Sequence, residues 1–342
     1  MACSGGCGRA RFVKGPHHHR EPFAQSYRDA SIHQMMLEDA IRTASYERAI
    51  QQMAPGQRVI DFGAGTGVLS IFAARSGAVS VDAIERTTFV HHARRIARDS
   101  GHPEIRFHHA DHESFEYEGQ ADLIVSEWMG HFLFYEAMLG PLIAIRNRYL
   151  RPGGRMLPER LHLHAALLTD QAFHEESAFF QGNPYGINFS SIAEQPLRQS
   201  RCVRVEPKQL CKRQFHLGTL DMATIQEMPA SLSGTCRVEQ ACMAYGIAAW
   251  FSADLTEEVC FGTGPYDPPT HWDQMLFPFP EPFVAYPDRT VTLEICPPRQ
   301  GEDDDPTWAW SITDGVETRY VDEFDTMTSA EDLQTEASYS QA

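Results

Sequence analysis

Two glutamates in the first half of the chain carry the strongest chemical signal. Glu127 and Glu136 lie in a segment, residues 126–136, whose other members are mostly aromatic or aliphatic. A carboxylate in such surroundings requires a cationic partner, because an unpaired buried charge is very costly. Two carboxylates that face one pocket suit a guanidinium group, which offers five donors in a planar fork. The alternative is a pair of ordinary surface glutamates.

A glycine-rich loop follows the first expected strand, residues 58–62, and precedes an expected helix, residues 68–76. Its pattern is Asp61-x-Gly63-x-Gly65-x-Gly67. Glycines at such a turn let a ligand approach the backbone closely. The dinucleotide fingerprint needs a further glycine at position 68, where this chain has valine, so the loop favours a nucleoside without a pyrophosphate. The alternative is a glycine turn that only packs the helix on the strand.

Glu85 closes the next expected strand, residues 79–84. An acidic side chain at this place can accept hydrogen bonds from the hydroxyl groups of a ribose. We therefore expect Glu85 to bind both ribose hydroxyls of a nucleoside ligand.

The elements that must position these residues alternate between strand and helix up to residue 150. This alternation predicts a parallel sheet with helices on both faces. Such sheets bind ligands outside the carboxyl ends of their strands, where the glycine loop and the two glutamates are expected. The expected strands are 58–62, 79–84, 105–109 and 123–126, and the expected helices are 31–53, 68–76, 89–100 and 135–149. Ser31 is expected to cap the first helix.

From Arg151 onward the chain consists of short strand-like runs separated by proline and glycine turns, which predicts a β-barrel or sandwich. Asp314-Gly315 is expected to join residues 307–313 to residues 316–321 as a hairpin. Trp308, Trp310 and Ile312 alternate onto one face of the first run. We divide the chain into a leader (1–22), a first domain (23–150), a second domain (151–325) and a disordered tail (326–342).

The charge balance indicates the kind of partner. Twenty-nine basic and 46 acidic residues give a net charge of −17, which argues against a general nucleic-acid binder and favours a cationic partner. The region from Glu302 to the end contributes strongly to this excess; it is either a solvated tail or an attractor of a basic substrate. No apolar stretch is long enough to cross a bilayer, and no signal peptide follows Met1.

The cysteines indicate the compartment. Eight are scattered along the chain, and none forms a CxxC pair, so we expect no zinc site and no redox motif. Reduced thiols are the rule in the cytosol and nucleus, and we expect the protein in one or both.

Three segments together resemble the protein arginine methyltransferase family. Residues 126–136 resemble its double-E loop, residues 31–43 its cofactor-covering helix, and Thr270-His271-Trp272 its THW loop. They occur in the family order, and with the glycine loop the resemblance spans residues 23 to 324. Two positions depart from the family pattern: Phe23-Ala24 replaces a Tyr-Phe pair, and His131 replaces a tyrosine.

The resemblance implies a fold and a cofactor. The fold is α/β, with a Rossmann-like class I methyltransferase domain followed by a β-barrel that carries an inserted helical dimerisation arm at about residues 168–190. The cofactor is S-adenosylmethionine, whose product is S-adenosylhomocysteine. Arg42 would hold its carboxylate with His33 nearby, and His112-Glu113 would meet the adenine edge. The residues implied to bind the cofactor are His33, Met36, Arg42, Asp61, Gly63, Gly65, Glu85, His112 and Glu113.

For the substrate, the resemblance implies that Glu127 and Glu136 grip an arginine guanidinium. His271 would pair with Asp39, and Trp272 would wall the arginine channel. Met36 and Met129 would flank the reacting centre, and no metal is required.

The expected activity is methyl transfer to guanidinium nitrogens of arginine in proteins, through monomethylarginine to asymmetric dimethylarginine. Histones or proteins rich in arginine and glycine are the expected substrates, without direct contact with nucleic acid or membrane. The chain is expected to form a homodimer through aromatic residues of the arm, namely Phe173, Phe179, Phe180 and Tyr185. The alternatives are a catalytically weak homologue that serves as partner of an active methyltransferase, and an enzyme that methylates a small molecule.

Overall fold

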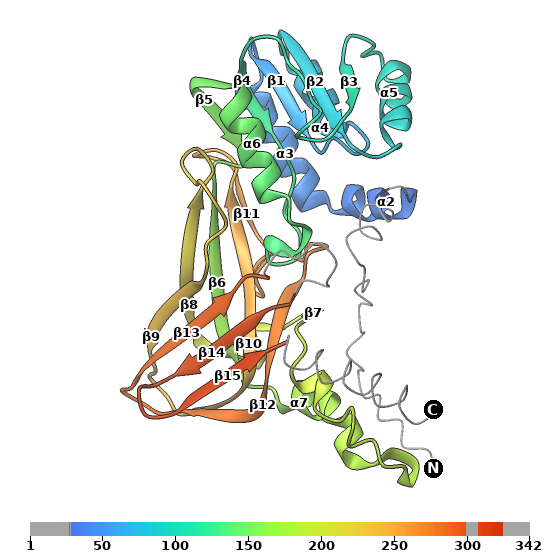
Figure 1. The fold of residues 1–342 in the computed structure, drawn as a ribbon. Helices are drawn as coiled ribbons and strands as arrows, with labels where there is room; N and C mark the ends of the chain where they lie inside the picture. Colours follow the sequence, from blue (N-terminus) through green and yellow to red (C-terminus); the bar gives the residue numbers. More distant parts are fainter. Residues whose placement is uncertain (1–26, 28, 299–306, 324–342) are drawn as a thin grey trace, which may run out of the picture.

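The computed structural model describes residues 27, 29–298 and 307–323 (Figure 1). The expected leader, the Phe23-Ala24 pair and the expected tail lie outside these residues. Figure 1 shows a parallel sheet with its helices at one end of the molecule and a large antiparallel barrel at the other, with an arm that projects from the barrel. The predicted fold class is confirmed.

The first domain contains a five-stranded sheet in the order β3-β2-β1-β4-β5, and all neighbours are parallel. Its strands are β1 (Arg58–Phe62), β2 (Ser80–Glu85), β3 (Arg106–His109), β4 (Ala121–Val125) and β5 (Leu150–Leu157). The helices between them are α4 (Val68–Arg75), α5 (Val90–Asp99) and α6 (Leu139–Tyr149). The strand order reverses between β1 and β4, so the loops that follow these two strands become neighbours.

Strand β5 extends the parallel sheet beyond the expected boundary at residue 150. Its proline and two glycines were expected to form a turn, but they lie within the strand. Ala121 pairs with Leu150 and Leu123 with Arg155, so the intervening residues form an irregularity that the sheet tolerates. Edge strands and bulges are where sheets accept proline and glycine, and β5 is an edge strand.

The expected helix over residues 31–53 is two helices, α2 (Ala30–Glu38) and α3 (Ala40–Met53). Asp39 separates them with an extended conformation and caps α3 by accepting a hydrogen bond from the amide of Arg42. Asp29, not Ser31, caps α2. Aspartate favours helix caps over helix interiors, and the apolar periodicity that continues across Asp39 concealed this break.

The second domain is built from two antiparallel sheets around one apolar interior. The larger sheet contains β6 (Arg160–Leu168), β7 (Arg201–Val203), β8 (Leu210–Asp221), β10 (Cys242–Asp254), β11 (Cys260–Gly262) and β12 (Gln274–Ala285). The smaller contains β9 (Leu232–Arg237), β13 (Thr290–Cys296), β14 (Ala309–Thr313) and β15 (Thr318–Asp322). Trp308, Trp310 and Ile312 are buried, as their alternation predicts.

The hairpin between β14 and β15 has a longer loop than the expected two residues. The carboxylate of Asp314 accepts hydrogen bonds from the amides of Val316 and Glu317, and Arg289 pairs with its other oxygen. These contacts hold the wider loop. The sequence pair Asp-Gly indicated a turn correctly but not its length.

The arm connects β6 to β7. It contains α7 (Gln171–Ser177) and the 3-10 turns η2 (Phe179–Gly182), η3 (Pro184–Gly186) and η4 (Gln195–Leu197), while η5 (Pro207–Gln209) precedes β8. Phe173 is buried against the barrel, so it anchors the arm to its own chain and is not an exposed dimer contact as expected. The other expected anchors remain accessible: Tyr185 is 94% and Phe179 56% exposed, and Phe180 is half-buried.

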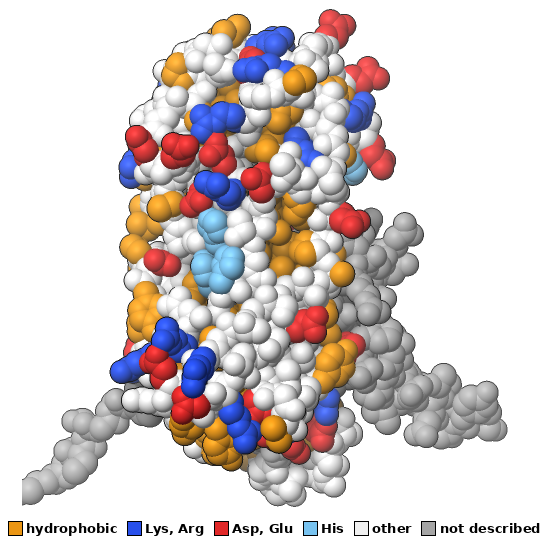
Figure 2. Space-filling model, turned by 90° about the vertical axis from the view of Figure 1, so that its left-hand side faces the viewer, with side chains coloured by type: hydrophobic (Ala, Val, Ile, Leu, Met, Phe, Trp, Pro, Cys, Tyr) orange, Lys and Arg blue, Asp and Glu red, His pale blue; other side chains and the backbone are white. Residues whose placement is uncertain are grey.

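Histidines gather on one face of the barrel (Figure 2). The rings of His162, His164 and His216 contact one another there, with centroids 5.6 to 6.5 Å apart. Burial, then the neighbouring His216, lowers the pKa of His164 to about 4.

Within the described residues, no group of histidine, cysteine or acidic side chains is arranged to hold a metal ion. The described helices include none that is long and apolar enough to span a membrane.

Candidate active site

The loop that carries the two glutamates follows β4 at the reversal point of the parallel sheet. Phe132, Leu133 and Ala137 adopt positive φ angles of 47°, 68° and 54°. Side chains other than glycine rarely do so, and each such residue costs free energy that the surroundings must supply. Contacts with the rest of the chain must therefore hold this loop in its conformation.

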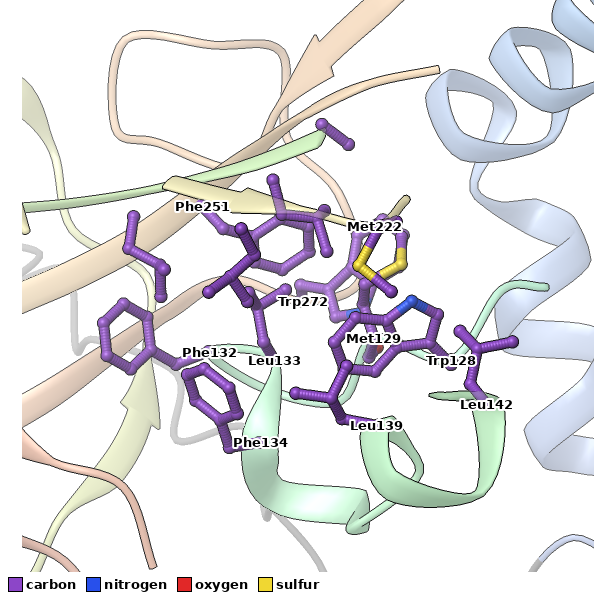
Figure 3. Close-up of a cluster of buried hydrophobic side chains, with 14 of the residues drawn as sticks. Trp128, Met129, Phe132, Leu133, Phe134, Leu139, Leu142, Met222, Phe251 and Trp272 are labelled. Atoms are coloured by element: carbon purple, nitrogen blue, oxygen red, sulfur yellow. The ribbon is translucent and has the colours of Figure 1, made fainter. Parts of the chain in front are cut away.

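Apolar side chains of the loop are buried between the two domains (Figure 3). Phe132 contacts Phe277 and Trp308 of the barrel, with ring centroids 5.8 Å apart in both pairs. Leu133 and Phe134 are buried as well, and in Figure 3 they lie in one cluster with Phe251 and Trp272. Burial of such side chains contributes about 1.5–3 kcal/mol each, which is enough to offset the strained backbone.

Glu127 forms a buried ion pair with Arg42 of α3. The Nε and Nη2 atoms of Arg42 donate hydrogen bonds of 2.8 and 2.6 Å to Oε2 of Glu127, and both side chains are almost fully buried. Nη1 of Arg42 donates to the carbonyl of Met36 on α2. The structure thus joins Arg42, expected at the cofactor, to Glu127, expected at the substrate, so the negative charge of Glu127 already has a partner.

Among the residues that the structure describes, none forms an ion pair with Glu136. Its Oε1 accepts a hydrogen bond of 2.9 Å from the hydroxyl of Tyr27. Burial, followed by the charge of Glu127, raises the pKa of Glu136 to about 8. The side chain is half-buried, so a ligand can reach it. The two carboxylates therefore differ: Glu127 is neutralised, and Glu136 favours a proton or an incoming cation.

Tyr27 and Gly130 are site residues that the sequence reasoning did not assign. Tyr27 supplies the donor to Glu136 from the segment ahead of α2. A Cβ atom at Gly130 would lie 2.8 Å from Cγ of Glu136, closer than real Cβ atoms approach a neighbour. Only glycine leaves room for the observed position of Glu136. The signal available in the sequence was the glycine between the two glutamates.

Asp39 and His271 form the expected pair. Oδ2 of Asp39 accepts hydrogen bonds from Nδ1 of His271 at 2.8 Å and from its backbone amide at 2.9 Å. Burial opposes ionisation of Asp39, but the hydrogen bonds from His271 and the Arg42 amide outweigh it and lower the pKa of Asp39. One carboxylate therefore breaks the helix, caps α3 and fixes the loop that precedes β12.

Trp272 is buried beside residues 126–136, the double-glutamate loop, and Met129 is a buried residue of that loop. Nε1 of Trp272 donates a 2.6 Å hydrogen bond to the carbonyl of Met129, and its ring stacks on Phe261. The sulfur of Met129 accepts from the hydroxyl of Tyr46. Another methionine, Met138, lies next to the glycine loop, with its Cε 3.4 Å from a Cβ position built on Gly63. The hydrogen bond from Trp272 to Met129 joins the loop before β12 to the double-glutamate loop.

The glycine loop lies between two acidic side chains. Oε2 of Glu85 accepts a hydrogen bond from the amide of Gly65, and its Oε1 accepts one from Thr87. Asp61 is buried; its Oδ2 accepts a hydrogen bond from the hydroxyl of Ser70, and its Oδ1 has no hydrogen-bond partner in the part of the chain that the structure describes. Burial raises the pKa of Asp61 to about 6. A buried acceptor without a partner is unfavourable, so Asp61 fits a ligand that donates to it.

His33 covers the glycine loop from α2. Its ring lies 3.9 Å from that of Phe89, its Nε2 donates to the carbonyl of Tyr27, and its Cε1 is 3.1 Å from a Cβ position built on Gly65. Burial lowers the pKa of His33. Helix α2 therefore closes over the loop, as a cofactor-covering helix would.

His112 and Glu113 lie on an exposed turn, whereas His131 contacts the loop before β12. His112 and Glu113 lie on a turn after β3, where Glu113 is 82% exposed and no hydrogen bond joins either side chain to Glu85 or the glycine loop in the described part of the chain. His131 donates from Nδ1 to the carbonyl of Trp272, and burial lowers its pKa. His131 thus links the double-glutamate loop to the loop before β12.

The comparisons with known proteins agree with this geometry. Residues 59–154 match a methyltransferase domain, and residues 159–315 match the arginine methyltransferase oligomerization subdomain. The chain is 30% identical to the probable protein arginine N-methyltransferase 6.1 of Oryza sativa subsp. indica over 80% of this chain and 82% of that protein. It is also 30% identical to protein arginine N-methyltransferase 1 of Saccharomyces cerevisiae, over 81% of this chain and 84% of that protein.

Solved structures show the same likeness. The Trypanosoma brucei PRMT1 enzyme-prozyme heterotetrameric complex with AdoHcy superposes with a TM-score of 0.79 at 27% identity, covering 87% of this chain and 98% of that chain. A crystal structure of PRMT6 superposes with a TM-score of 0.65 at 25% identity, covering 79% and 95%.

Fold and site together define a methyltransferase. The chain belongs to the protein arginine methyltransferase family, as the resemblance implied, and is a protein arginine N-methyltransferase that depends on S-adenosylmethionine. Its residues fit that cofactor: Asp61 has a buried acceptor atom without a partner among the described residues, Glu85 closes a parallel strand, and three glycines with positive φ lie in the loop after β1.

Glu85→Ala is expected to weaken binding of S-adenosylhomocysteine. Losing hydrogen bonds to a charged acceptor costs roughly 1.5–3 kcal/mol, which is about 10- to 150-fold in affinity. Calorimetry would measure the dissociation constant, with Glu116→Ala, an exposed glutamate, as the matched control. An unchanged constant for Glu85→Ala in a folded protein would contradict the assignment.

Proposed function

We propose that Glu127 and Glu136 bind the guanidinium of a substrate arginine and that Glu136 is the group it pairs with. The observation that supports this most is the unequal environment of the two carboxylates. Glu127 is neutralised by Arg42, whereas Oε1 of Glu136 accepts a hydrogen bond from the neutral Tyr27 hydroxyl, and the pKa of Glu136 is raised. A guanidinium supplies both the charge and the donors that Glu136 lacks.

The residues of this chain act by position and electrostatics. When bound, S-adenosylmethionine supplies an electrophilic methyl group on a sulfonium. A guanidinium, with a pKa above about 12, is a poor nucleophile because its lone pairs are delocalised. Glu136 and Glu127 draw the positive charge toward the nitrogens they contact and orient the remaining nitrogen. Asp39 and His271 join the start of α3 to the loop before β12 through their hydrogen bonds.

The alternative of a catalytically weak homologue predicts the loss of a charged site residue. Arg42, Glu127 and Glu136 are all present, and the structure brings them together. We therefore favour an active enzyme. Paired carboxylates next to a THW loop also favour an arginine side chain over a small molecule.

We further propose asymmetric dimethylarginine as the final product, with monomethylarginine as an intermediate. Met36 lies half-buried on α2, and its carbonyl accepts hydrogen bonds from Arg42 and Thr43. These contacts place the backbone of Met36 beside Arg42, which pairs with Glu127. A flexible methionine there can yield room for a methyl group already on the substrate.

Basic proteins, including histones or arginine- and glycine-rich chains, are the substrates that suit the net charge of −17.

Glu136→Gln tests the central proposal. Removing the charge without changing the shape is expected to lower kcat by about 100-fold or more and to leave binding of S-adenosylhomocysteine within about twofold. Mass spectrometry of a methylated arginine peptide measures turnover, and hydrolysis separates the dimethylarginine isomers. Glu257→Gln, at an exposed glutamate, is the control. Normal turnover of Glu136→Gln would refute the role of Glu136, and a symmetric product would refute the argument from Met36.

The pH dependence follows from Glu136. Below about pH 8 this carboxyl carries a proton in the free protein, and it must lose that proton to bind a guanidinium. kcat/KM is therefore expected to fall about tenfold per pH unit on the acidic side of about pH 8. The Tyr27 hydrogen bond lowers the pKa of Glu136, so Tyr27→Phe is expected to move the inflection to higher pH. A profile that is flat from pH 6 to 9 would count against this assignment.

We also propose a homodimer in which each arm contacts the other methyltransferase domain. The exposed arm residues Phe179, Tyr185 and Ile187 form an apolar tip. A groove of about 170 Å³ between α3 and α4 could receive it, lined by Glu47, Gln51, Phe72, Arg75 and Ser76. The matched oligomerization subdomain supports this arrangement.

The double variant Tyr185→Asp with Ile187→Asp is expected to convert the dimer to a monomer. Charges on the tip of the arm would prevent its burial against a partner. Light scattering at micromolar concentration gives the mass, and Val316→Asp, another exposed apolar position, is the control. A monomeric mass for the unmodified protein would refute the proposal itself.

A further inference from the structure

A groove of about 390 Å³ lies where α2 and α3 meet the loop before β12. Helix α2 contributes Glu38 to its lining, and the loop contributes Thr270. Asp39 and His271, the pair expected at the active site, line the groove as well. The proposed function leaves the groove itself without a role.

Arg42 connects the groove to the two glutamates. Its backbone amide donates a hydrogen bond of 3.0 Å to Asp39, which lines the groove, and its guanidinium pairs with Glu127. One arginine side chain thus spans the distance between them, roughly 7 Å, which is about two residues of extended chain. A substrate whose arginine reaches the glutamates therefore brings its neighbouring residues close to the groove.

Glu38 gives the groove a negative charge that has no cationic partner in the described part of the chain. Its Oε1 accepts a hydrogen bond of 2.6 Å from Nε2 of Gln34, which is neutral. Arg204, a basic side chain of the lining, is already engaged, because it pairs with Asp273 and donates to the carbonyl of Thr270. A cation that enters the groove would find Glu38 as its partner.

Apolar side chains accompany this carboxylate in the lining. Met35 is 43% exposed, Ile41 is half-buried, and Pro269 is exposed. Thr270 is buried, and its Oγ1 has no hydrogen-bond partner among the described residues, so a bound donor would satisfy it. A lysine or arginine side chain fits such a lining, because its methylene stem covers apolar surface while its charged head meets a carboxylate. An acidic side chain would be repelled by Glu38.

We propose that this groove holds a lysine or arginine side chain of the substrate, located within three residues of the methylated arginine, and that Glu38 binds its charged group. This role rests on the proposed function, since the substrate arginine is taken to lie at Glu127 and Glu136. It makes Glu38 a residue that selects among substrates. The net charge of −17 attracts any basic protein, whereas the groove selects a basic residue at a defined spacing from the arginine.

Fluorescence anisotropy of labelled peptides on the protein loaded with S-adenosylhomocysteine tests this role without turnover. Each peptide holds one arginine among glycines, with lysine at one of the three positions on either side. A matched peptide carries norleucine, which has an apolar stem without the charge, at the same place. At one or two neighbouring positions lysine is expected to lower the dissociation constant about three- to fivefold relative to norleucine. Equal constants at all six positions would overturn the proposal, and so would an equal gain at all six, which indicates attraction by net charge alone.

Two variants of Glu38 assign the effect to the groove. Glu38→Gln is expected to raise the dissociation constant of the preferred lysine peptide to that of its norleucine match. Glu38→Lys, which suits the last turn of α2, is expected to reverse the preference, so that glutamate at that position binds more tightly than norleucine. Glu257→Gln, at an exposed glutamate, is the control and is expected to keep the lysine preference. A lysine preference that survives in Glu38→Gln would overturn the proposal.

Glu136→Gln separates this role from the proposed function on which it rests. If the substrate arginine lies at Glu136, this variant weakens binding of lysine and norleucine peptides alike, and the ratio of their dissociation constants stays the same. Unchanged affinity for every peptide would contradict the proposed arginine site, whereas loss of the lysine preference in Glu38→Gln would still support the groove.

Discussion

The buried pair of Arg42 and Glu127 is the interaction on which the site depends. It joins α3 to the loop after β4, and through the carbonyl of Met36 it also holds α2. Removing one partner of such a pair leaves a buried charge and costs about 3–5 kcal/mol. The pair thus fixes where the covering helices lie over the sheet. It also satisfies Glu127, so that Glu136 alone in this loop has a carboxylate without a cationic partner.

The barrel contributes to the site by holding a strained loop. Backbone angles such as those of Phe132 and Leu133 persist only where the surroundings determine them. Here the surroundings are apolar side chains of the second domain and the hydrogen bond from Trp272 to the carbonyl of Met129. The first domain supplies the two glutamates, and the second domain supplies the apolar side chains that hold their loop. Neither domain therefore forms the site alone. This explains why residues far from the chemistry, such as Phe277, must pack well for the carboxylates to keep their positions.

The sequence predicted the parts of this molecule that depend on local patterns. Alternating strands and helices predicted the parallel sheet, and the alternation of Trp308, Trp310 and Ile312 predicted their burial. What it could not predict depends on contacts between distant residues. The helix break at Asp39 exists because its carboxylate binds His271, and the pairing of Arg42 with Glu127 follows from the sheet order.

The unequal carboxylates also bear on where the substrate proton goes under the proposed function. Methyl transfer to a guanidinium nitrogen makes that group more acidic, so a nearby base must accept a proton as the new bond forms. Asp39 is a weak candidate, because hydrogen bonds from His271 and the Arg42 amide lower its pKa. Glu127 is engaged by Arg42. Burial and the charge of Glu127 raise the pKa of Glu136 to about 8, which makes Glu136 a stronger base than Asp39. We therefore infer that the carboxylate that attracts the guanidinium also receives its proton.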